Sequence, residues 1–242
     1  MRKAFVILSA AACLASGLAT AQSTNGVAVR LQAGKHQTIV GFGTSLTAGG
    51  IWIKQLQGIL DQRYPGLVTI VNSGGSGMWS QWGLDNLEER VIRQKPGVVI
   101  IEFAVNDSVA RFHCTVQQSR TNLETMITRI LAANPDCEIF LMTTTPADGP
   151  PVGNTSYRDS IARYYEMYRQ VAKARSLTVI DLYPVWTALQ GKDKRTFANY
   201  VPDTIHPGEE GCRQVVTPGI LKAFGLAPEP AAAGHAPKPQ TR

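Results

Sequence analysis

Four short segments carry residue types that together are suited to acyl transfer by a serine. Ser45 follows a glycine-flanked segment, Gly77 ends a glycine-rich run, Asn106 lies in a short polar run, and Asp203 stands three residues before His206. A serine hydroxyl is a weak nucleophile until a base removes its proton. One turn would bring the Asp203 carboxylate to the His206 ring, where it can orient the ring and stabilise its protonated form. Ser45, His206 and Asp203 are therefore the candidate nucleophile, base and acid.

Acyl transfer also needs hydrogen-bond donors for the negative charge that develops on the carbonyl oxygen. Three groups are candidates for this oxyanion hole: the backbone N–H of Ser45, the backbone N–H of Gly77 and the side-chain amide of Asn106. Glycine lets a backbone N–H approach a ligand closely, and asparagine supplies two amide donors.

Competing interpretations exist for each of these residues. His113 lies seven residues after Asn106 and is the alternative base, and Asp181 is the alternative acid, although a helix cap is its default role. Ser45 and Asn106 could be turn or cap residues. Asp107 is expected to be a structural hydrogen-bonding residue, and the glycosylation pattern at 106–108 is treated as chance.

These residues need a scaffold that places strand ends side by side. Five apolar segments rich in β-branched residues predict buried strands, at 38–43, 68–71, 98–103, 138–143 and 177–181. Apolar residues at three-and-four spacing predict helices around 123–131 and 157–171, the first ending at Asn134-Pro135. Alternating strands and helices predict an α/β fold with a parallel sheet covered on both faces. Sites in such sheets lie at the carboxyl ends of the strands.

The four segments together resemble the SGNH or GDSL hydrolases, which are serine esterases and lipases. Gly43-Thr44-Ser45-Leu46 stands where the family has Gly-Asp-Ser-Leu, 72–77 resembles its glycine block, 104–107 resembles Gly-x-Asn-Asp, and 203–206 matches Asp-x-x-His. The resemblance implies a flavodoxin-like three-layer α/β/α sandwich with a five-stranded parallel sheet. It also implies the catalytic roles given above and a reaction that requires neither a cofactor nor a metal.

Two departures from the family pattern concern the substrate pocket. Thr44 replaces the aspartate before the serine, and Ala104 replaces a glycine near the oxyanion site. Neither change removes a group that performs chemistry, so only the size of the acyl pocket is in question. Thr44, Trp79 and Trp82 are candidate pocket residues, and an aromatic ring there could stack on a sugar or cover an acyl chain.

The N-terminal residues predict export. Residues 1–21 combine Arg2 and Lys3, an apolar stretch and a small-x-small ending, which is typical of a cleaved signal peptide, with a lipoprotein acceptor at Cys13 as an alternative. The apolar stretch is too short for a spanning helix. We therefore expect a hydrolase domain at 22–225, a disordered tail rich in proline and alanine at 226–242, and a secreted or periplasmic location.

Charge and cysteine content exclude other classes. The formal net charge of +6 falls to +4 without residues 1–21, which hold two basic and no acidic residues, and the remaining basic residues are scattered. Nucleic-acid binding is therefore not expected. Stable membrane insertion is not expected either, because no apolar segment is long enough to span a bilayer. Cys114, Cys137 and Cys212 fit no zinc pattern. Buried free thiols are expected. A disulfide between Cys114 and Cys137 is rejected because the predicted helix between them places them too far apart. A disulfide between Cys114 and Cys212 remains an alternative.

The sequence thus predicts a monomeric secreted serine esterase acting on a small-molecule or polysaccharide ester. By analogy with the family, short acyl groups such as acetyl on carbohydrate are the leading substrate. The alternatives are a lysophospholipase, an arylesterase or an acyl thioesterase of the same fold, and a catalytically idle domain that binds carbohydrate.

Overall fold

The computed structural model describes residues 26–147, 158 and 160–227 of the chain. Its centre is one parallel sheet with the strand order β2-β1-β3-β4-β5. The strands are β1 (Gln37–Gly43), β2 (Val68–Asn72), β3 (Val98–Glu102), β4 (Glu138–Thr143) and β5 (Thr178–Asp181). The α/β class, the five strands and the parallel pairing predicted from the sequence are confirmed.

The apolar strands are buried because both faces of the sheet are covered. In β3, Val99 and Ile101 face one hydrophobic cluster and Val98 and Ile100 face the other. Because side chains alternate with a period of two, the strand contributes to two separate cores. This explains why its residues from Val98 to Ile101 are all apolar.

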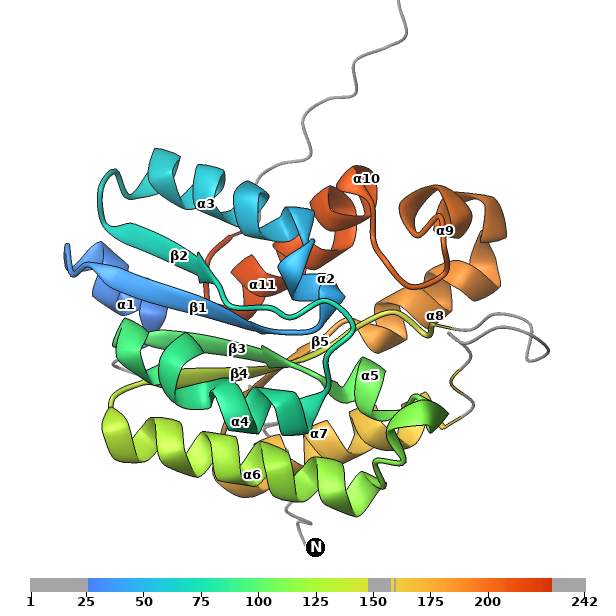
Figure 1. Cartoon of the computed structure of the whole chain (residues 1–242). Coiled ribbons are helices and arrows are strands. Elements are labelled where there is room, and N and C mark those ends of the chain that lie inside the picture. Colours follow the sequence, from blue (N-terminus) through green and yellow to red (C-terminus); the bar gives the residue numbers. More distant parts are fainter. Residues whose placement is uncertain (1–25, 148–157, 159, 228–242) are drawn as a thin grey trace, which may run out of the picture.

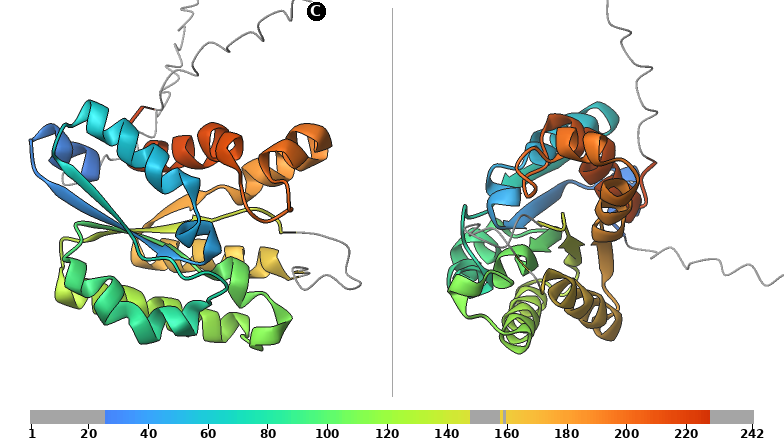
Figure 2. Two further views of the ribbon diagram at one scale, coloured as in Figure 1. Left: turned by 45° about the horizontal axis from the view of Figure 1, so that its top comes forward. Right: turned by 90° about the vertical axis from the view of Figure 1, so that its right-hand side faces the viewer.

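Two layers of helices enclose the sheet (Figures 1 and 2). Helices α4, α6 and α7 pack on one face, and α1, α3, α8 and α11 contribute buried residues to the cluster on the other. The helical segments are α1 (Val27–Gln32), α2 (Ser45–Ala48), α3 (Ile51–Arg63), α4 (Ser80–Arg90), η1 (Ile92–Gln94), α5 (Ala104–Asp107), η2 (Ala110–Phe112), α6 (Val116–Ala133), α7 (Ile161–Arg175), α8 (Tyr183–Lys192), α9 (Lys194–Tyr200), α10 (Glu209–Gly211), the π-helical η3 (Cys212–Val216) and α11 (Thr217–Ala223).

The ends of the helices follow local sequence signals. The side chain of Thr115 accepts a hydrogen bond from the Gln118 N–H at the start of α6, and the helix ends before Asn134-Pro135 as expected. Helix α7 begins at Ile161, and the earlier part of the predicted helix includes residues outside those described.

The folded part of the chain extends one residue further than predicted. Gly225 adopts a φ of 76° after α11, and the backbone N–H of Leu226 donates to Leu221 O while that of Gly225 donates to Lys222 O. This is the Schellman arrangement, in which the residue after the glycine packs back on the helix. Leu226 is accordingly buried, so its assignment to the tail is corrected; residues 228–242 lie outside the described part of the chain.

The three cysteines of the described chain are buried free thiols, as expected. The predicted signal peptide falls on residues outside the described ranges. No helix within those ranges is long and apolar enough to cross a membrane.

The strand order fixes where a site can form. The chain runs from β1 outward to β2 and then returns to place β3 on the other side of β1. The connections after β1 and β3 therefore leave toward opposite faces of the sheet and open a crevice at the carboxyl ends of these two strands. Ser45 follows β1 and Asn106 follows β3, so both residues border this crevice.

Candidate active site

Ser45 begins a single helical turn directly after β1. Thr44 follows the strand in an extended conformation and caps α2, because its side chain accepts a hydrogen bond from the Leu46 N–H. Ser45 occupies the first helical position, where a backbone N–H has no partner within the helix. The turn therefore presents both a hydroxyl and a backbone donor of Ser45 at the edge of the sheet.

The structure brings Ser45, His206 and Asp203 together from distant parts of the sequence. Ser45 Oγ lies 2.8 Å from His206 Nε2, and His206 Nδ1 lies 2.6 Å from Asp203 Oδ2. The second carboxylate oxygen, Asp203 Oδ1, accepts hydrogen bonds from the backbone N–H groups of Ile205 and His206. This arrangement orients the His206 ring so that Nε2 faces the serine hydroxyl.

Hydrogen bonds keep Asp203 ionised. Partial burial opposes ionisation, but the bonds donated by the backbone and ring of His206 and by the Ile205 N–H outweigh it and hold the pKa of Asp203 below its usual value. A negative carboxylate beside Nδ1 stabilises the histidine cation that forms when the ring takes a proton from serine.

Contacts with the rest of the fold fix the loop that carries His206. Thr145, which follows β4 and is fully buried, donates a 2.8 Å hydrogen bond to Ile205 O. The loop also turns back on the end of α9, where the Gly208 N–H donates to Tyr200 O. The sequence analysis did not identify Thr145, because a threonine after a buried strand carries no distinctive pattern.

The three predicted oxyanion donors lie on segments that are in contact. The Gly75 N–H donates to Gly43 O, which joins the glycine-rich loop to the end of β1. Asn106 Nδ2 donates to Met78 O at 2.7 Å, which joins α5 to the residue after Gly77. Gly77 has a φ of 72°, a backbone conformation that favours glycine.

Each of the three candidate groups keeps an N–H that is available to an oxyanion. Within the described part of the chain, neither the Ser45 N–H nor the Gly77 N–H donates a hydrogen bond. Asn106 keeps one N–H beyond the one it gives to Met78 O, because a primary amide has two. The segments around Ser45 therefore hold three donors that could bind an oxyanion.

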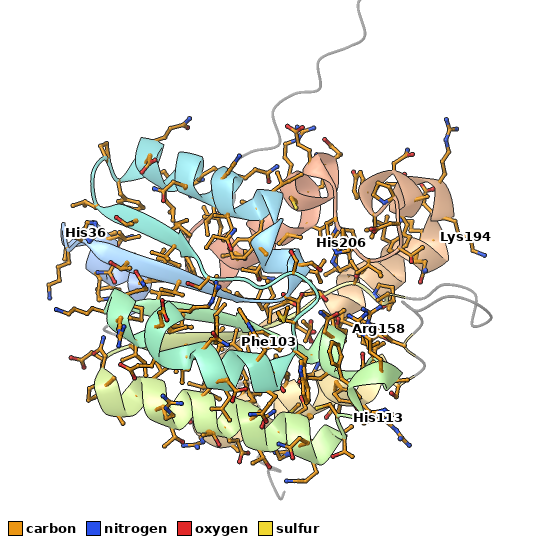
Figure 3. The ribbon with its side chains drawn as sticks, in the orientation of Figure 1. His36, Phe103, His113, Arg158, Lys194 and His206 are labelled. Carbon is orange, nitrogen blue, oxygen red and sulfur yellow. The ribbon has the colours of Figure 1, made fainter. Side chains whose placement is uncertain are left out.

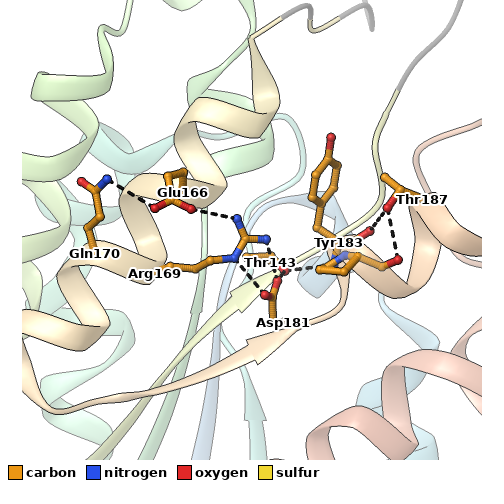
Figure 4. A network of polar contacts seen from close by, with 8 residues as sticks. Thr143, Glu166, Arg169, Gln170, Asp181, Tyr183 and Thr187 are labelled. Atoms are coloured by element: carbon orange, nitrogen blue, oxygen red, sulfur yellow. Dashed lines mark hydrogen bonds and ion pairs between the residues drawn. The ribbon is translucent and has the colours of Figure 1, made fainter.

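The competing acid, Asp181, has another partner. It accepts hydrogen bonds from Arg169 Nε at 2.8 Å, from Arg169 Nη2 at 3.0 Å and from Thr143 Oγ1 at 2.7 Å, as Figure 4 shows. These bonds lower the pKa of Asp181 despite its partial burial. The helix-cap role expected for Asp181 is wrong, because α8 has no side-chain cap and the carboxylate joins β5 to α7 instead.

The two other histidines within the described ranges do not replace His206. Figure 3 places His36 at the opposite end of the sheet from His206. His113 is exposed at the end of η2 with a φ of 49°, and the ring that contacts Ser45 Oγ is that of His206. Asp107 is buried and accepts hydrogen bonds from the Ser119 hydroxyl and the Ser80 N–H, in agreement with the structural role expected for it.

A buried carboxylate, Glu102, supports the serine turn from the end of β3. It accepts hydrogen bonds from the backbone N–H and hydroxyl of Thr44 and from the hydroxyl of Thr47, each at 3.1 or 3.2 Å. A Cβ at Gly43 would lie 2.6 Å from Glu102 Oε2, so glycine is required there. Sequence reasoning missed Glu102, although a charged residue in an otherwise apolar strand was a usable signal.

Burial makes Glu102 a poor acid. Desolvation raises its pKa from 4.5 to about 8, while the hydrogen bonds from Thr44 and Thr47 act in the opposite direction. The folded protein therefore holds a proton on Glu102 at pH values where the unfolded chain has lost it.

We expect this proton to make stability depend on pH. The free energy of unfolding should fall by a few kcal/mol as the pH rises from about 5 to about 8, since one pKa unit corresponds to about 1.4 kcal/mol. Glu102→Gln cannot titrate and should give a flatter profile in urea unfolding measured at pH 5, 6, 7 and 8. Asp107→Asn is the comparison, because burial raises the pKa of Asp107 only to about 6. The contribution of Asp107 to the pH dependence of the free energy of unfolding should therefore end near pH 6. Equal slopes for Glu102→Gln and the wild type above pH 6 would contradict the assignment.

A mostly apolar pocket adjoins the Ser45–His206 pair. Its walls come from α2 and the start of α3, from the end of β4 and from the C-terminal part of the chain. The lining residues are Ser45, Leu46, Gly49, Gly50, Trp52, Met142, Thr144, Leu182, Trp186, His206, Pro207, Cys212 and Val216. Trp52 and Trp186 were not identified from the sequence, because buried aromatic residues are far more often core than pocket.

The predicted pocket residues lie elsewhere. Thr44 is fully buried and bound to Glu102, so its assignment to the pocket is wrong. Trp82 is also misassigned, because its partly buried ring packs against Phe42 and Phe103 of the core and does not line the pocket at Ser45. Trp79 is half-buried and stacks on Phe112 with ring centroids 5.3 Å apart, beside the glycine-rich loop and outside the pocket at Ser45.

This fold and this arrangement of serine, histidine and aspartate are typical of serine hydrolases. The sequence profile of the GDSL-like Lipase/Acylhydrolase family matches residues 39–214. The chain belongs to this family and is a carboxylic ester hydrolase. No curated protein matches the chain.

Several solved structures share the fold at low sequence identity. Axe2, an acetylxylan esterase from Geobacillus stearothermophilus, is 20% identical with a TM-score of 0.69, over 82% of this chain and 98% of that one. A protein described as a GDSL-like lipase, from Parabacteroides merdae, is 19% identical with a TM-score of 0.70, over 79% and 97%. LAE5, an alpha/beta hydrolase from the metagenome of Lake Arreo, is 21% identical with a TM-score of 0.66, over 79% and 96%.

Proposed function

We propose that this ester hydrolase is a serine esterase that removes small acyl groups, acetyl in particular, from carbohydrate esters. The observation that carries the proposal is the continuous contact from Ser45 Oγ through the His206 ring to the Asp203 carboxylate. Ser45 is only partly buried at the carboxyl edge of the sheet, where a substrate can reach it.

The reaction follows from this geometry. Ser45 Oγ attacks the ester carbonyl carbon while His206 Nε2 takes the hydroxyl proton, and the carbonyl oxygen gains the negative charge. The N–H groups of Ser45, Gly77 and Asn106 bind that charge. His206 then gives its proton to the departing alcohol, which leaves an acyl group on Ser45. Water, deprotonated by the same histidine, releases the acid and restores the serine.

The choice of a small acyl group on carbohydrate rests on three supporting facts. The pocket at Ser45 is confined by Trp52 and Trp186, which are both buried. Trp79 places a half-buried aromatic ring beside the glycine-rich loop, and such rings stack on sugars. The fold also resembles that of a protein named as an acetylxylan esterase.

A chain-length series tests the substrate class. We expect the mature chain to hydrolyse p-nitrophenyl acetate faster than the butyrate, and to hydrolyse the octanoate and palmitate very slowly. Acetylated xylooligosaccharides should release acetate in the same preparation. Preference for octanoate or longer would replace the carbohydrate substrate with a lipid or a thioester. No turnover of any ester, together with no labelling by a fluorophosphonate, would instead indicate a carbohydrate-binding domain without catalysis.

Export and a monomeric state complete the proposal. The pattern of residues 1–21 supports cleavage after Ala21 during secretion or transfer to the periplasm. The intact mass of the protein recovered outside the cytoplasm tests the cleavage, and sedimentation tests the monomer. A mass that retains residues 1–21 would contradict the proposed cleavage, and a stable dimer would contradict the proposed monomer.

A further inference from the structure

A buried arginine lies directly behind one of the oxyanion donors. Arg158 is 7% exposed, and its guanidinium donates from Nη2 to Asn106 Oδ1 at 3.1 Å and from Nε to Val105 O at 2.5 Å. In Figure 3, Arg158 lies at the same end of the molecule as His206. Burial lowers the pKa of Arg158 below its usual value, yet arginine remains protonated in proteins. The Asn106 amide therefore accepts a hydrogen bond from a cation.

The contacts of Asn106 permit only one orientation of its amide. Its Nδ2 donates to Met78 O, while its Oδ1 accepts from Arg158. A flipped amide would place its N–H groups against the guanidinium N–H groups and its oxygen against Met78 O. Both contacts would be repulsive, so Arg158 and Met78 together decide which end of the amide faces which neighbour.

The charge of Arg158 has a second effect on the same amide. A cationic donor bound to the amide oxygen draws electron density from the amide nitrogen, because hydrogen bonds in a chain polarise one another. The free N–H of Asn106 thereby becomes a stronger donor toward an anionic oxygen.

We propose that Arg158 is a positioning residue of the oxyanion hole, which acts on the transition state only through the Asn106 amide. The inference rests on the proposed function, because the oxyanion forms only if Ser45 attacks an ester. Arg158 touches no reacting atom. It holds the amide in the donating orientation and strengthens the N–H that the oxyanion receives.

Kinetics of single and double variants on p-nitrophenyl acetate test this role. Removing one oxyanion donor costs about 10²- to 10³-fold in kcat, so we expect Asn106→Ala to fall in that range and Arg158→Met to lose about 10- to 100-fold. KM should change by less than about 3-fold in both, because the donor acts mainly on the transition state. The double variant should be no slower than Asn106→Ala alone, because Arg158 has nothing left to position.

Two further variants separate positioning from general support of the fold. Arg158→Lys keeps the charge but cannot bind Val105 O and Asn106 Oδ1 with one planar group, so its kcat should lie between those of the wild type and Arg158→Met. Arg163→Met removes an exposed arginine on α7 and should leave kcat unchanged. If Arg158→Met does not fold, Arg158→Lys with and without Asn106→Ala supplies the same cycle.

The outcomes distinguish the inference from the proposed function. The positioning role would be overturned if replacing Arg158 still lowered kcat in the Asn106→Ala background. Full activity of Arg158→Met would also overturn it. If the wild type hydrolyses no ester, the proposed function fails, and the side-chain amide signals of Asn106 in an NMR spectrum then test the contact alone. Unchanged Asn106 amide shifts in Arg158→Met would overturn the inference independently of activity.

Discussion

Ser45→Ala should lower kcat for p-nitrophenyl acetate by at least about 10⁴-fold. The variant removes the atom that forms the acyl-enzyme, while the oxyanion donors and the binding surface remain. A small residual rate above that of water is therefore expected, because these donors still stabilise charge on a carbonyl oxygen. In this variant, water activated by His206 would have to attack the ester directly, and the reaction would pass through no acyl-enzyme.

The fold should tolerate this change. Ser45 Oγ contacts His206 Nε2 and is partly exposed, so the thermal midpoint of Ser45→Ala should stay within a few degrees of that of the wild type. Ser160→Ala is the matched control, because Ser160 lies at the start of α7 and its side chain makes no capping hydrogen bond. An equal loss of kcat in Ser45→Ala and Ser160→Ala would indicate that the fold, and not the catalytic serine, is affected. Retained activity in Ser45→Ala, with fluorophosphonate labelling still present, would place the nucleophile elsewhere.

The order of the strands explains why residues so far apart in the sequence form one site. Ser45 and His206 are separated by 161 positions and are in hydrogen-bond contact. The crevice between the ends of β1 and β3 receives Ser45 from one connection and Asn106 from the other. The His206 loop reaches the same edge because Thr145, after β4, holds it there. A parallel sheet thus collects catalytic groups at one edge without any long insertion.

The sequence revealed the parts of the site that depend on local patterns. An apolar strand followed by glycine and serine is visible in the sequence, and so is an acid three residues before a histidine, because a single turn determines their geometry. Ser45, His206 and Asp203 could therefore be predicted from the sequence.

Residues that act across the fold could not be predicted in the same way. The partners of Asp181 and Glu102 depend on how the helices pack against strand ends, and no short pattern encodes this. Arg158 is 52 positions from Asn106 and precedes α7, and no short sequence pattern links the two residues. Thr44 was misassigned to the pocket for a related reason. Its hydroxyl and N–H face inward to a carboxylate contributed by another strand.

Asp203→Asn should lower kcat by about 10³- to 10⁴-fold with little change in KM. The amide can donate a hydrogen bond to His206 Nδ1, which favours the tautomer that carries its proton on Nε2. That tautomer cannot accept the proton of Ser45, and the histidine cation also loses its negative neighbour. The two N–H groups of Ile205 and His206 still find an oxygen on the asparagine, so the loop should keep its shape.

Asp181→Asn is the matched comparison, because both aspartates are partly exposed and both lie beside a basic side chain. Asp181→Asn should lower the free energy of unfolding by about 1 kcal/mol, because Arg169 loses the bidentate carboxylate that links β5 to α7. Its kcat should remain within about 2-fold of the wild type, because Asp181 binds Arg169 and Thr143 rather than His206. Steady-state kinetics and urea unfolding of both variants separate the two effects. If Asp181→Asn abolished turnover while Asp203→Asn kept it, the acid partner of His206 would have to be reassigned, and the orienting contact seen at Asp203 Oδ2 would be only structural.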